Sequence, residues 1–185
     1  TGSAGSIGSE IVRQISIYKP EKLILIDQAE TPQHDIRLMM RFDYPNIKVE
    51  TIVANITNLD RMESIFKQYK PEYVFHAAAY KHVPMMENNP SESIQNNVWG
   101  TKVIADLSVK YGVKKFVMVS TDKAVNPTNV MGCSKRICEI YCQSLNKKIN
   151  QDSNKEKSTQ FVTTRFGNVL GSNGSVIPLF EKQIK

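Results

Sequence analysis

The stretch TGSAGSIG, residues 1–8, places glycines at positions 2, 5 and 8 and runs into apolar residues at helical spacing as far as Tyr18. A short apolar strand, KLILID at residues 22–27, follows and ends on Asp27. A glycine-rich turn at a helix N-terminus brings backbone N–H groups close to a pyrophosphate, and the helix dipole favours the anion. A carboxylate at the end of the next strand can accept hydrogen bonds from a ribose. The two stretches together predict a dinucleotide-binding unit.

Outside this unit, short apolar strands alternate with amphipathic helices, which is typical of a parallel sheet covered on both faces. We expect strands at about 22–27, 48–54, 72–77, 115–120 and 161–165, and helices at about 7–18, 32–42, 58–69, 90–111, 129–149 and 176–185. The predicted fold class is α/β, a Rossmann-like doubly wound parallel sheet. The strand that usually precedes the glycine loop is central in this fold. We expect that first strand and the C-terminal substrate region to be missing from these 185 residues.

The composition is that of a soluble globular protein, with 41% hydrophobic and 23% charged residues. No apolar run approaches the roughly 20 residues that a membrane helix needs. Much of the net charge of +6 comes from lysines in the polar run at 146–160, which has no aromatic residue to stack on bases. We therefore expect no nucleic-acid partner and no membrane segment in this chain. A surface for polyphosphate or anionic lipid is the alternative interpretation of this run.

The chain has three cysteines, Cys133, Cys138 and Cys142, with neither CxxC spacing nor a neighbouring histidine. Zinc sites depend on such spacings. We therefore expect no metal site and interpret the cysteines as free thiols on one helix.

A second informative stretch begins where the strand at 115–120 ends. Ser120, Thr121, Asp122 and Lys123 follow one another, and Lys135 comes twelve positions after Lys123. Ligands of open α/β sheets bind at the carboxyl ends of the strands. A hydroxyl, a carboxylate and an amine side by side can transfer protons. The alternative is a polar turn in which Asp122 caps the next segment and Lys123 is solvated.

Asp27 also bears on the choice between the two common nicotinamide dinucleotides. A carboxylate repels a 2′-phosphate, and no Arg or Lys lies between Asp27 and Arg37 to offset it. We therefore expect NAD rather than NADP.

Several motifs, in the same order, resemble extended short-chain dehydrogenases/reductases. The glycine loop follows their TGxxGxxG form, and NVWGT at 97–101 is similar to their Asn-x-x-Gly-Thr. A closer likeness comes from YKHVP at 80–84, STDKAVNPTNVMG at 120–132 and the segment 165–180. Over nearly the whole chain, these resemble the UDP-N-acetylglucosamine 4,6-dehydratases of capsule and O-antigen polysaccharide biosynthesis.

The resemblance implies that residues 1–185 are part of an NAD-binding Rossmann-like domain, with the substrate-binding part beginning at about 166–185. The implied enzyme is an NAD-dependent lyase. It would convert UDP-N-acetylglucosamine to UDP-2-acetamido-2,6-dideoxy-hexos-4-ulose by oxidation at C4, elimination of water across C5–C6 and hydride return. The alternatives are a UDP-sugar 4-epimerase or reductase of the same superfamily, and a non-catalytic dinucleotide sensor.

The resemblance also implies roles at the second stretch. Asp122 is expected to be the acid and Lys123 the base of the elimination, while Lys135 holds the nicotinamide ribose. Met131 departs from the superfamily, which has tyrosine there as the base for the sugar hydroxyl. Because methionine carries no proton, Thr121 or Asp122, or a water between them, is expected to deprotonate the C4 hydroxyl.

The remaining implied site residues fall into two sets. The cofactor set is Gly2, Ser3, Gly5, Ser6, Ile7, Gly8, Asp27, Asn55, Ile56, Ala77, Ala78, Ala79 and Lys135. The substrate set is Lys81, His82, Asn97, Met131, Asn168, Ser175 and Val176. His76 is expected to be a hydrogen-bonded structural residue, and Tyr80 a packing residue.

The resemblance finally implies a UDP-sugar as substrate and a homo-oligomer in the full-length protein. The expected location is cytoplasmic. Some relatives have an N-terminal membrane region, so the full-length protein is a candidate for anchoring to the inner face of the membrane.

Overall fold

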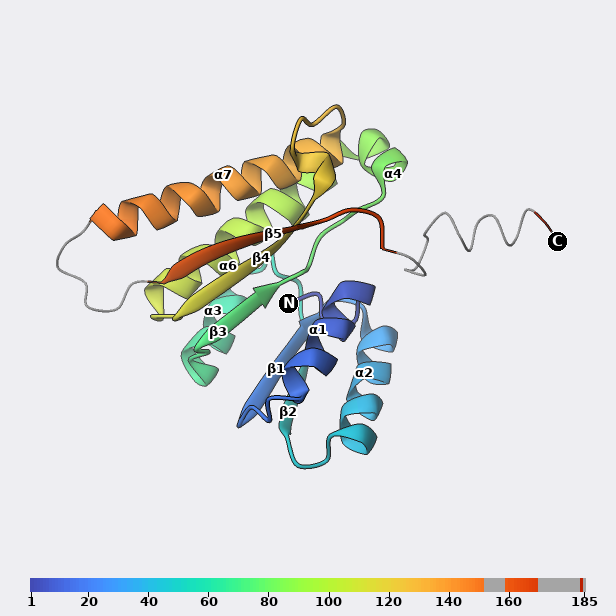
Figure 1. Ribbon diagram of the computed structural model, residues 1–185, viewed down its shortest axis with the longest axis vertical. Coiled ribbons are helices and arrows are strands. Elements are labelled where there is room, and N and C mark those ends of the chain that lie inside the picture. The colour runs from blue at the N-terminus through green and yellow to red at the C-terminus, as the bar shows by residue number, and fades with distance from the viewer. Residues whose placement is uncertain (152–158, 170–183, 185) are drawn as a thin grey trace.

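The computed structural model describes residues 1–151, 159–169 and 184, and its strands are all parallel (Figure 1). One sheet pairs β1 (Lys22–Asp27) with β2 (Lys48–Val53), and the other has the order β3 (Tyr73–His76), β4 (Lys115–Thr121), β5 (Gln160–Phe166). The α/β class with parallel strands is therefore confirmed. Each strand begins and ends within two residues of its predicted bounds.

The first two residues hydrogen bond to both sheets. The Thr1 amino group donates to the Phe75 carbonyl at 2.8 Å, and the Ala77 amide donates to the Thr1 carbonyl at 3.0 Å. The Gly2 amide donates to the Ile26 carbonyl at 2.8 Å. The glycine loop therefore begins between the carboxyl ends of β1 and β3, where the N-terminus lies in Figure 1.

Helices connect the strands and cover the sheets. The longer ones are α1 (Ser6–Ser16), α2 (Glu30–Asp43), α3 (Leu59–Tyr69), α6 (Gly100–Lys110) and α7 (Val130–Gln151). Helix α2 packs on β1 and β2, α6 packs on β3, and α7 packs on β4 and β5. Among the described helices, none is long and apolar enough to cross a membrane.

The helix predicted from 90 to 111 is continuous as far as residue 110, but its middle segment has π rather than α geometry. It consists of α5 (Pro90–Ser93), a π-helical turn η1 (Ile94–Trp99) and then α6, and an unpredicted helix α4 (Val83–Asn88) precedes it. A proline lies in the first turn of both α4 and α5, where its missing N–H costs nothing. The extra residue of a π turn changes the direction of side chains, and such turns are frequent at functional sites.

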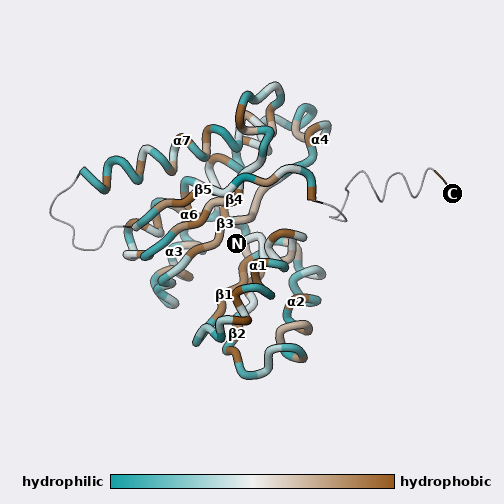
Figure 2. Tube along the Cα trace, in the orientation of Figure 1, coloured by the Kyte–Doolittle hydropathy of each residue, from teal (hydrophilic) through white to brown (hydrophobic). Residues whose placement is uncertain are grey.

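Two apolar clusters form the core. The larger one lies under α3, α6 and α7 and includes the fully buried Met62, Ile104 and Phe116. The smaller one lies between α2 and the first sheet and includes Leu25 and Met40. In Figure 2, apolar residues gather along the strands while the helices alternate between apolar and polar residues. The core thus holds the strands rigidly, and their carboxyl ends carry the residues described next.

Candidate active site

Two adjoining cavities lie at the carboxyl ends of the strands. The smaller has a volume of about 230 Å³ and the larger about 930 Å³. Both are lined by Gly2, Gly5, Ala77, Ala79 and Tyr80. The glycine loop and the segment after β3 therefore form the boundary between the two cavities.

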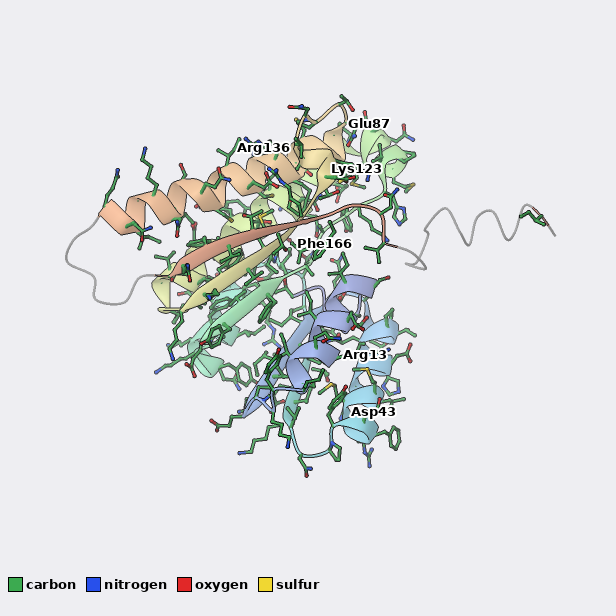
Figure 3. The ribbon with its side chains drawn as sticks, in the orientation of Figure 1. Arg13, Asp43, Glu87, Lys123, Arg136 and Phe166 are labelled. Atoms are coloured by element: carbon green, nitrogen blue, oxygen red, sulfur yellow. The ribbon has the colours of Figure 1, made fainter. Side chains whose placement is uncertain are left out.

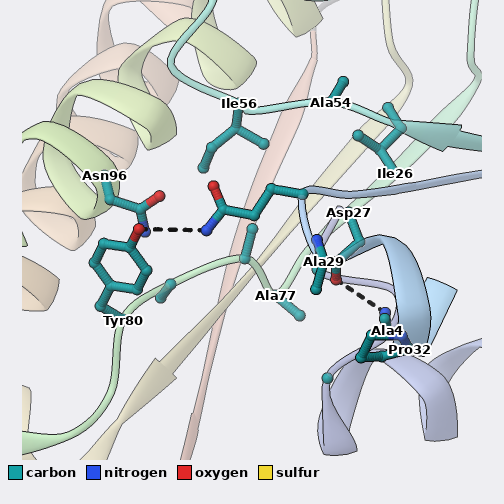
Figure 4. Close-up of a pocket in the computed structure, with 15 residues that line it drawn as sticks. Ala4, Ile26, Asp27, Ala29, Pro32, Ala54, Ile56, Ala77, Tyr80 and Asn96 are labelled. Carbon is teal, nitrogen blue, oxygen red and sulfur yellow. Dashed lines mark hydrogen bonds between the residues drawn. The ribbon is translucent and has the colours of Figure 1, made fainter.

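Asp27 is fixed at the wall of the smaller cavity. Its Oδ2 accepts a hydrogen bond from the Ala4 amide at 3.0 Å (Figure 4). Its Oδ1 accepts one from the Ala29 amide at 3.0 Å. A carboxylate oxygen can accept more than one hydrogen bond. Asp27 can thus bind the hydroxyls of a ribose without giving up the bonds that orient it.

The glycine loop has no room for side chains at two positions. A Cβ on Gly8 would lie 1.8 Å from the Gly2 carbonyl oxygen, and one on Gly2 would lie 2.5 Å from the Ala78 nitrogen. Gly2 also has φ of +71°, which favours glycine. This packing sets the start of α1 at the cavity wall. Gly5 provides no side-chain cap there, so the positive end of the helix faces the cavities.

These features fit a nicotinamide dinucleotide. The uncapped helix start suits a diphosphate, and Asp27 suits the adenosine ribose. Of the residues predicted to bind the cofactor, the following line the cavities: Gly2, Gly5, Ser6, Ile7, Gly8, Asp27, Ile56, Ala77, Ala78, Ala79 and Lys135.

Two members of the predicted cofactor set, Ser3 and Asn55, do not line either cavity. Ser3 is buried and donates to Gln33 Oε1 at 2.8 Å. The Oδ1 atom of Asn55 accepts hydrogen bonds from both the amide and the hydroxyl of Thr57 at 2.9 Å. Ser3 thus contacts helix α2, whereas Asn55 contacts its own loop.

A network of polar side chains lies at the end of β4, next to the larger cavity. The Thr121 hydroxyl donates to Asp122 Oδ1 at 2.9 Å. The Lys123 amine donates to the same oxygen at 3.2 Å and to Asn168 Oδ1 at 3.2 Å. Figure 3 shows Lys123 and Phe166, which neighbours the Asn168 segment, at the same end of the sheet. The predicted hydroxyl, carboxylate and amine are therefore brought together, with an amide from the segment after β5.

The Asp122 side chain is more exposed than that of Lys123, at 57% against 36%. The hydrogen bonds from Thr121 and Lys123 hold the pKa of Asp122 below its usual value, so the carboxyl is ionised at neutral pH. Thr121 and Lys123 line the cavity, whereas Asp122 does not. Asp122 therefore reaches the cavity through its two neighbours.

Met131 and Lys135 lie on the first turns of α7 and line the same cavity. Both are buried, with 4% and 5% of their surfaces exposed. Burial lowers the pKa of Lys135, although nearby Cys138, Cys142 and Glu139 oppose this effect. The four-residue spacing places the two side chains on one face of the helix. An amine and a thioether thus stand where the superfamily motif has an amine and a phenol.

The predicted substrate set is divided by the structure. Lys81, His82, Met131 and Asn168 line the larger cavity. Asn97 lies behind its wall and is fully buried. Ser175 and Val176 lie outside the described residues.

Asn97 instead connects three segments. Its side chain accepts from the Tyr80 amide at 2.8 Å and donates to the Tyr80 carbonyl at 3.0 Å. It also donates to Ser134 Oγ on α7 at 3.0 Å. The π turn thus turns Asn97 inward, where it holds the segment after β3 against α7.

His76 is a structural residue, as the sequence predicted. It is fully buried, and its ring nitrogens contact the hydroxyls of Thr1 at 2.7 Å and Thr101 at 2.9 Å. Burial, with contributions from Lys135 and the chain's amino terminus, lowers the pKa of His76 well below its usual value. The ring is therefore a neutral link between β3 and α6.

Sequence reasoning missed several cavity residues. Tyr80, predicted to be a packing residue, lines both cavities, and its hydroxyl accepts a hydrogen bond from Gln28 Nε2 at 3.3 Å (Figure 4). The other unpredicted residues of the larger cavity include Met85, Met86, Asn89, Glu92, Phe166 and Val169. Pro84 was the available signal for α4, since proline favours the first turn of a helix.

The chain matches, over residues 1–185, the family described as "Polysaccharide biosynthesis protein". It is 50% identical to the capsular polysaccharide biosynthesis protein CapD of Staphylococcus aureus, covering 100% of this chain and 30% of that protein. It is 36% identical to a UDP-N-acetylglucosamine 4,6-dehydratase (inverting) of Campylobacter jejuni, covering 100% of this chain and 52% of the relative. A UDP-glucose 4-epimerase of Rickettsia canadensis is also 36% identical, with the same two coverages.

A solved structure, Pen from Bacillus thuringiensis, has a similar fold. It superposes with a TM-score of 0.86 at 36% identity, covering 99% of this chain and 55% of that one. The chain thus spans between about a third and about half of the length of these relatives.

Proposed function

Because the chain belongs to the family of polysaccharide biosynthesis proteins, we propose that it carries the cofactor site and the catalytic side chains of an NAD-dependent UDP-N-acetylglucosamine 4,6-dehydratase. The observation that carries the proposal is the network of Thr121, Asp122 and Lys123 at the end of β4, beside the cavity lined by Lys135. Elimination of water from a sugar needs a base and an acid close together, and this network contains both.

The bound NAD would accept a hydride from C4 of the sugar and later return one to C6. Asp27 would hold its adenosine ribose, the start of α1 its diphosphate, and Lys135 its nicotinamide ribose. NAD is favoured over NADP because a 2′-phosphate would lie against the Asp27 carboxylate.

The first proton transfer would pass along the hydrogen bond between Thr121 and Asp122. As the C4 hydroxyl is oxidised, its proton moves to Thr121, whose own proton moves to Asp122 Oδ1, 2.9 Å away. Asp122 can accept it because the carboxyl is ionised beforehand, and its lowered pKa makes the protonated form a ready donor in the next step. This path replaces the tyrosine that Met131 does not provide.

The elimination then uses Lys123 at C5 and Asp122 at C6. Lys123, as the neutral amine, removes the C5 proton, which the C4 ketone has made acidic. The protonated Asp122 passes its proton through the Thr121 hydroxyl to the C6 hydroxyl. The C5–H and C6–O bonds break, the C5–C6 double bond forms, and water leaves. When the hydride returns to C6, the Lys123 ammonium gives a proton back to C5, and the amine is neutral again. Asn168 holds the Lys123 amine from the other side at 3.2 Å.

An epimerase is the second candidate function, because the relatives include an equally similar UDP-glucose 4-epimerase. An epimerase needs the same C4 oxidation but no acid and base for C5 and C6. The closeness of Lys123 to both Asp122 and Asn168 favours the dehydratase. A reductase or a non-catalytic sensor has no use for this network either.

The product distinguishes these functions. The whole protein, incubated with NAD and UDP-N-acetylglucosamine, is expected to give a sugar nucleotide lighter by one water, measured by mass spectrometry. In deuterated water the product should gain deuterium at C5. An epimerised product of unchanged mass, or net consumption of reduced cofactor, would exclude the dehydratase. UDP-glucose as a parallel substrate tests whether the acetamido group is required.

A further inference from the structure

Glu139 is a fully buried carboxylate on α7, one turn beyond Lys135. Arg165 of β5 contacts it with two parallel hydrogen bonds, Nε to Oε1 at 2.8 Å and Nη2 to Oε2 at 2.7 Å. Arg136 adds a third bond, Nη1 to Oε2 at 3.0 Å. A two-point contact of this kind fixes orientation as well as distance. Glu139 therefore attaches the end of β5 rigidly to α7.

The Glu139 carboxylate is ionised at all physiological pH values. Burial alone would raise its pKa, but the interactions with Arg165, Ser120 and Arg136 outweigh burial and lower the pKa of Glu139 to about 2. Both arginine side chains are partly exposed, at 39% and 37%, so their remaining N–H groups can reach water. The contact is therefore a permanent ion pair and not a switch.

Arg165 is the last anchored side chain before the cavity. The pairing of β5 with β4 ends where Phe166 lies opposite Thr121. Residues 167–169 leave the sheet, yet they line the larger cavity. In this segment Asn168 accepts the hydrogen bond from Lys123, and a Cβ on Gly167 would lie 3.8 Å from Asp122 Oδ2. The position of this segment therefore determines the environment of both proposed proton-transfer groups.

We propose that Glu139 and Arg165 are positioning residues for the elimination step. Their ion pair holds residues 166–169 over Asp122 and Lys123, so that Asn168 keeps the Lys123 amine directed at the substrate. The inference rests on the proposed function, since it assigns a step of that reaction. Neither residue lines the larger cavity, so they act on it through their neighbours. Arg165 acts through the segment that follows β5, and Glu139 also lies near Ser120 and Lys135 of the cavity wall.

The rest of β5 does not depend on this pair. Seven consecutive residues of β5 pair with β4, from Gln160 opposite Lys115 onward, and Phe161 packs on Phe116 with ring centroids 5.1 Å apart. Loss of the ion pair should therefore leave the sheet and the cofactor site in place and release only the segment beyond Phe166. This separates a positioning role from a general structural one.

The test compares three variants of the whole enzyme. Glu139→Gln removes the charge, and Arg165→Lys keeps a positive charge but loses the planar two-point contact. Glu63→Gln is the control, because Glu63 ties α3 to α6 through Lys110 and Tyr111, away from the cavities. Each variant is measured for kcat of water loss, KM of UDP-N-acetylglucosamine, NAD affinity by calorimetry, and reduction of the nicotinamide in a single turnover.

The expected result is a selective defect. In Glu139→Gln and Arg165→Lys, kcat of water loss should fall about 100-fold, the loss that small misplacements of catalytic groups produce. NAD affinity and KM should stay within about twofold of wild type, and nicotinamide reduction should persist. Glu63→Gln should behave as wild type in all four measurements.

Two results would overturn the inference. One is unchanged kcat of water loss in both variants. The other is a parallel fall of nicotinamide reduction, NAD affinity and water loss, which would indicate a general loss of structure. If Glu139→Gln fails to fold, Arg165→Lys decides alone, since it keeps the buried charge paired. Absence of water loss in the wild-type enzyme would instead contradict the proposed function.

Discussion

Lys123 is the single side chain on which the proposed elimination depends most. Glutamine in its place keeps most of its length and can still contact Asp122 and Asn168, but it cannot accept the C5 proton. Lys123→Gln should lower kcat of water loss by about 10²- to 10⁴-fold, the usual contribution of a general base. Mass spectrometry of the product measures this. Lys67→Gln, on the exposed surface of α3, is the control. An unaltered pH–rate profile in Lys123→Gln would remove Lys123 from the mechanism.

At the same scale, Asp27 is the residue proposed to select NAD over NADP. In Asp27→Asn, one acceptor oxygen is replaced by a donor, and the charge that repels a 2′-phosphate is lost. We expect NAD affinity to fall about tenfold and the preference for NAD over NADP to shrink by about the same factor. Calorimetric titration with each dinucleotide measures both values. Asp35→Asn, exposed on α2, should change neither. An unchanged preference in Asp27→Asn would place the source of selectivity elsewhere.

At the scale of elements, the first turn of α7 packs against the turn η2 (Asp122–Ala124). A Cβ on Gly132 would lie 2.4 Å from the Lys123 carbonyl oxygen, a backbone atom that can yield only if the turn moves. Gly132→Ala should therefore displace Lys123 and lower kcat at least about tenfold while NAD affinity is retained. Steady-state kinetics and calorimetry measure the two effects. The adjacent Cys133→Ala, on an exposed position, should be silent. Equal kcat in the two variants would contradict the packing argument.

The ion pair between α7 and β5 also predicts a pH dependence of stability. Because the pKa of Glu139 is lowered from 4.5 to about 2 on folding, the stabilisation is complete above the unfolded pKa and is lost as pH falls towards the folded one. The difference in urea midpoint between wild type and Glu139→Gln should thus be largest above about pH 5 and should shrink towards pH 3.

Glu10→Gln is the matched control for this prediction. Glu10 pairs with Arg13 at 3.8 Å, and both side chains are more than half exposed. Exposed pairs contribute little, so its midpoint should follow wild type at every pH. A difference for Glu139→Gln that stays constant with pH would show that the carboxylate charge does not stabilise the fold.

At the scale of the whole molecule, Phe116 connects the three strands of the second sheet. It is fully buried near the start of β4 and contacts the rings of His76 on β3 and Phe161 on β5. Phe116→Ala should lower the free energy of unfolding by about 3–5 kcal/mol, since the rigid core cannot close the cavity. Phe42→Ala, where the side chain is 71% exposed, should change it by less than about 0.5 kcal/mol. Urea unfolding followed by circular dichroism measures both. Similar urea midpoints for Phe116→Ala and Phe42→Ala would mean that Phe116 is not part of the stabilising core.

Local sequence was sufficient for the elements and for much of the site. The glycine loop, the strand ending on Asp27 and the Thr121–Lys123 turn were predicted in place, because each depends on residues adjacent in the chain. Hydrophobic periodicity likewise predicted every described strand. It did not predict α4 or the π segment of the helix after residue 90, because the π turn has no distinct hydrophobic period.

The sequence by itself therefore determined the fold class and placed the residues of the candidate cofactor site and of the proposed proton-transfer turn. Only the tertiary structure brought Asn168 to Lys123, 45 positions away, and Arg165 to Glu139, 26 positions away. It also turned Asn97 from a predicted substrate contact into a buried link between Tyr80 and α7. These contacts depend on which strands are neighbours and on the direction that the π turn gives a side chain. Neither the order of the strands nor the direction of that side chain is encoded in any short stretch of sequence. Both are set by the packing of the whole sheet and its helices.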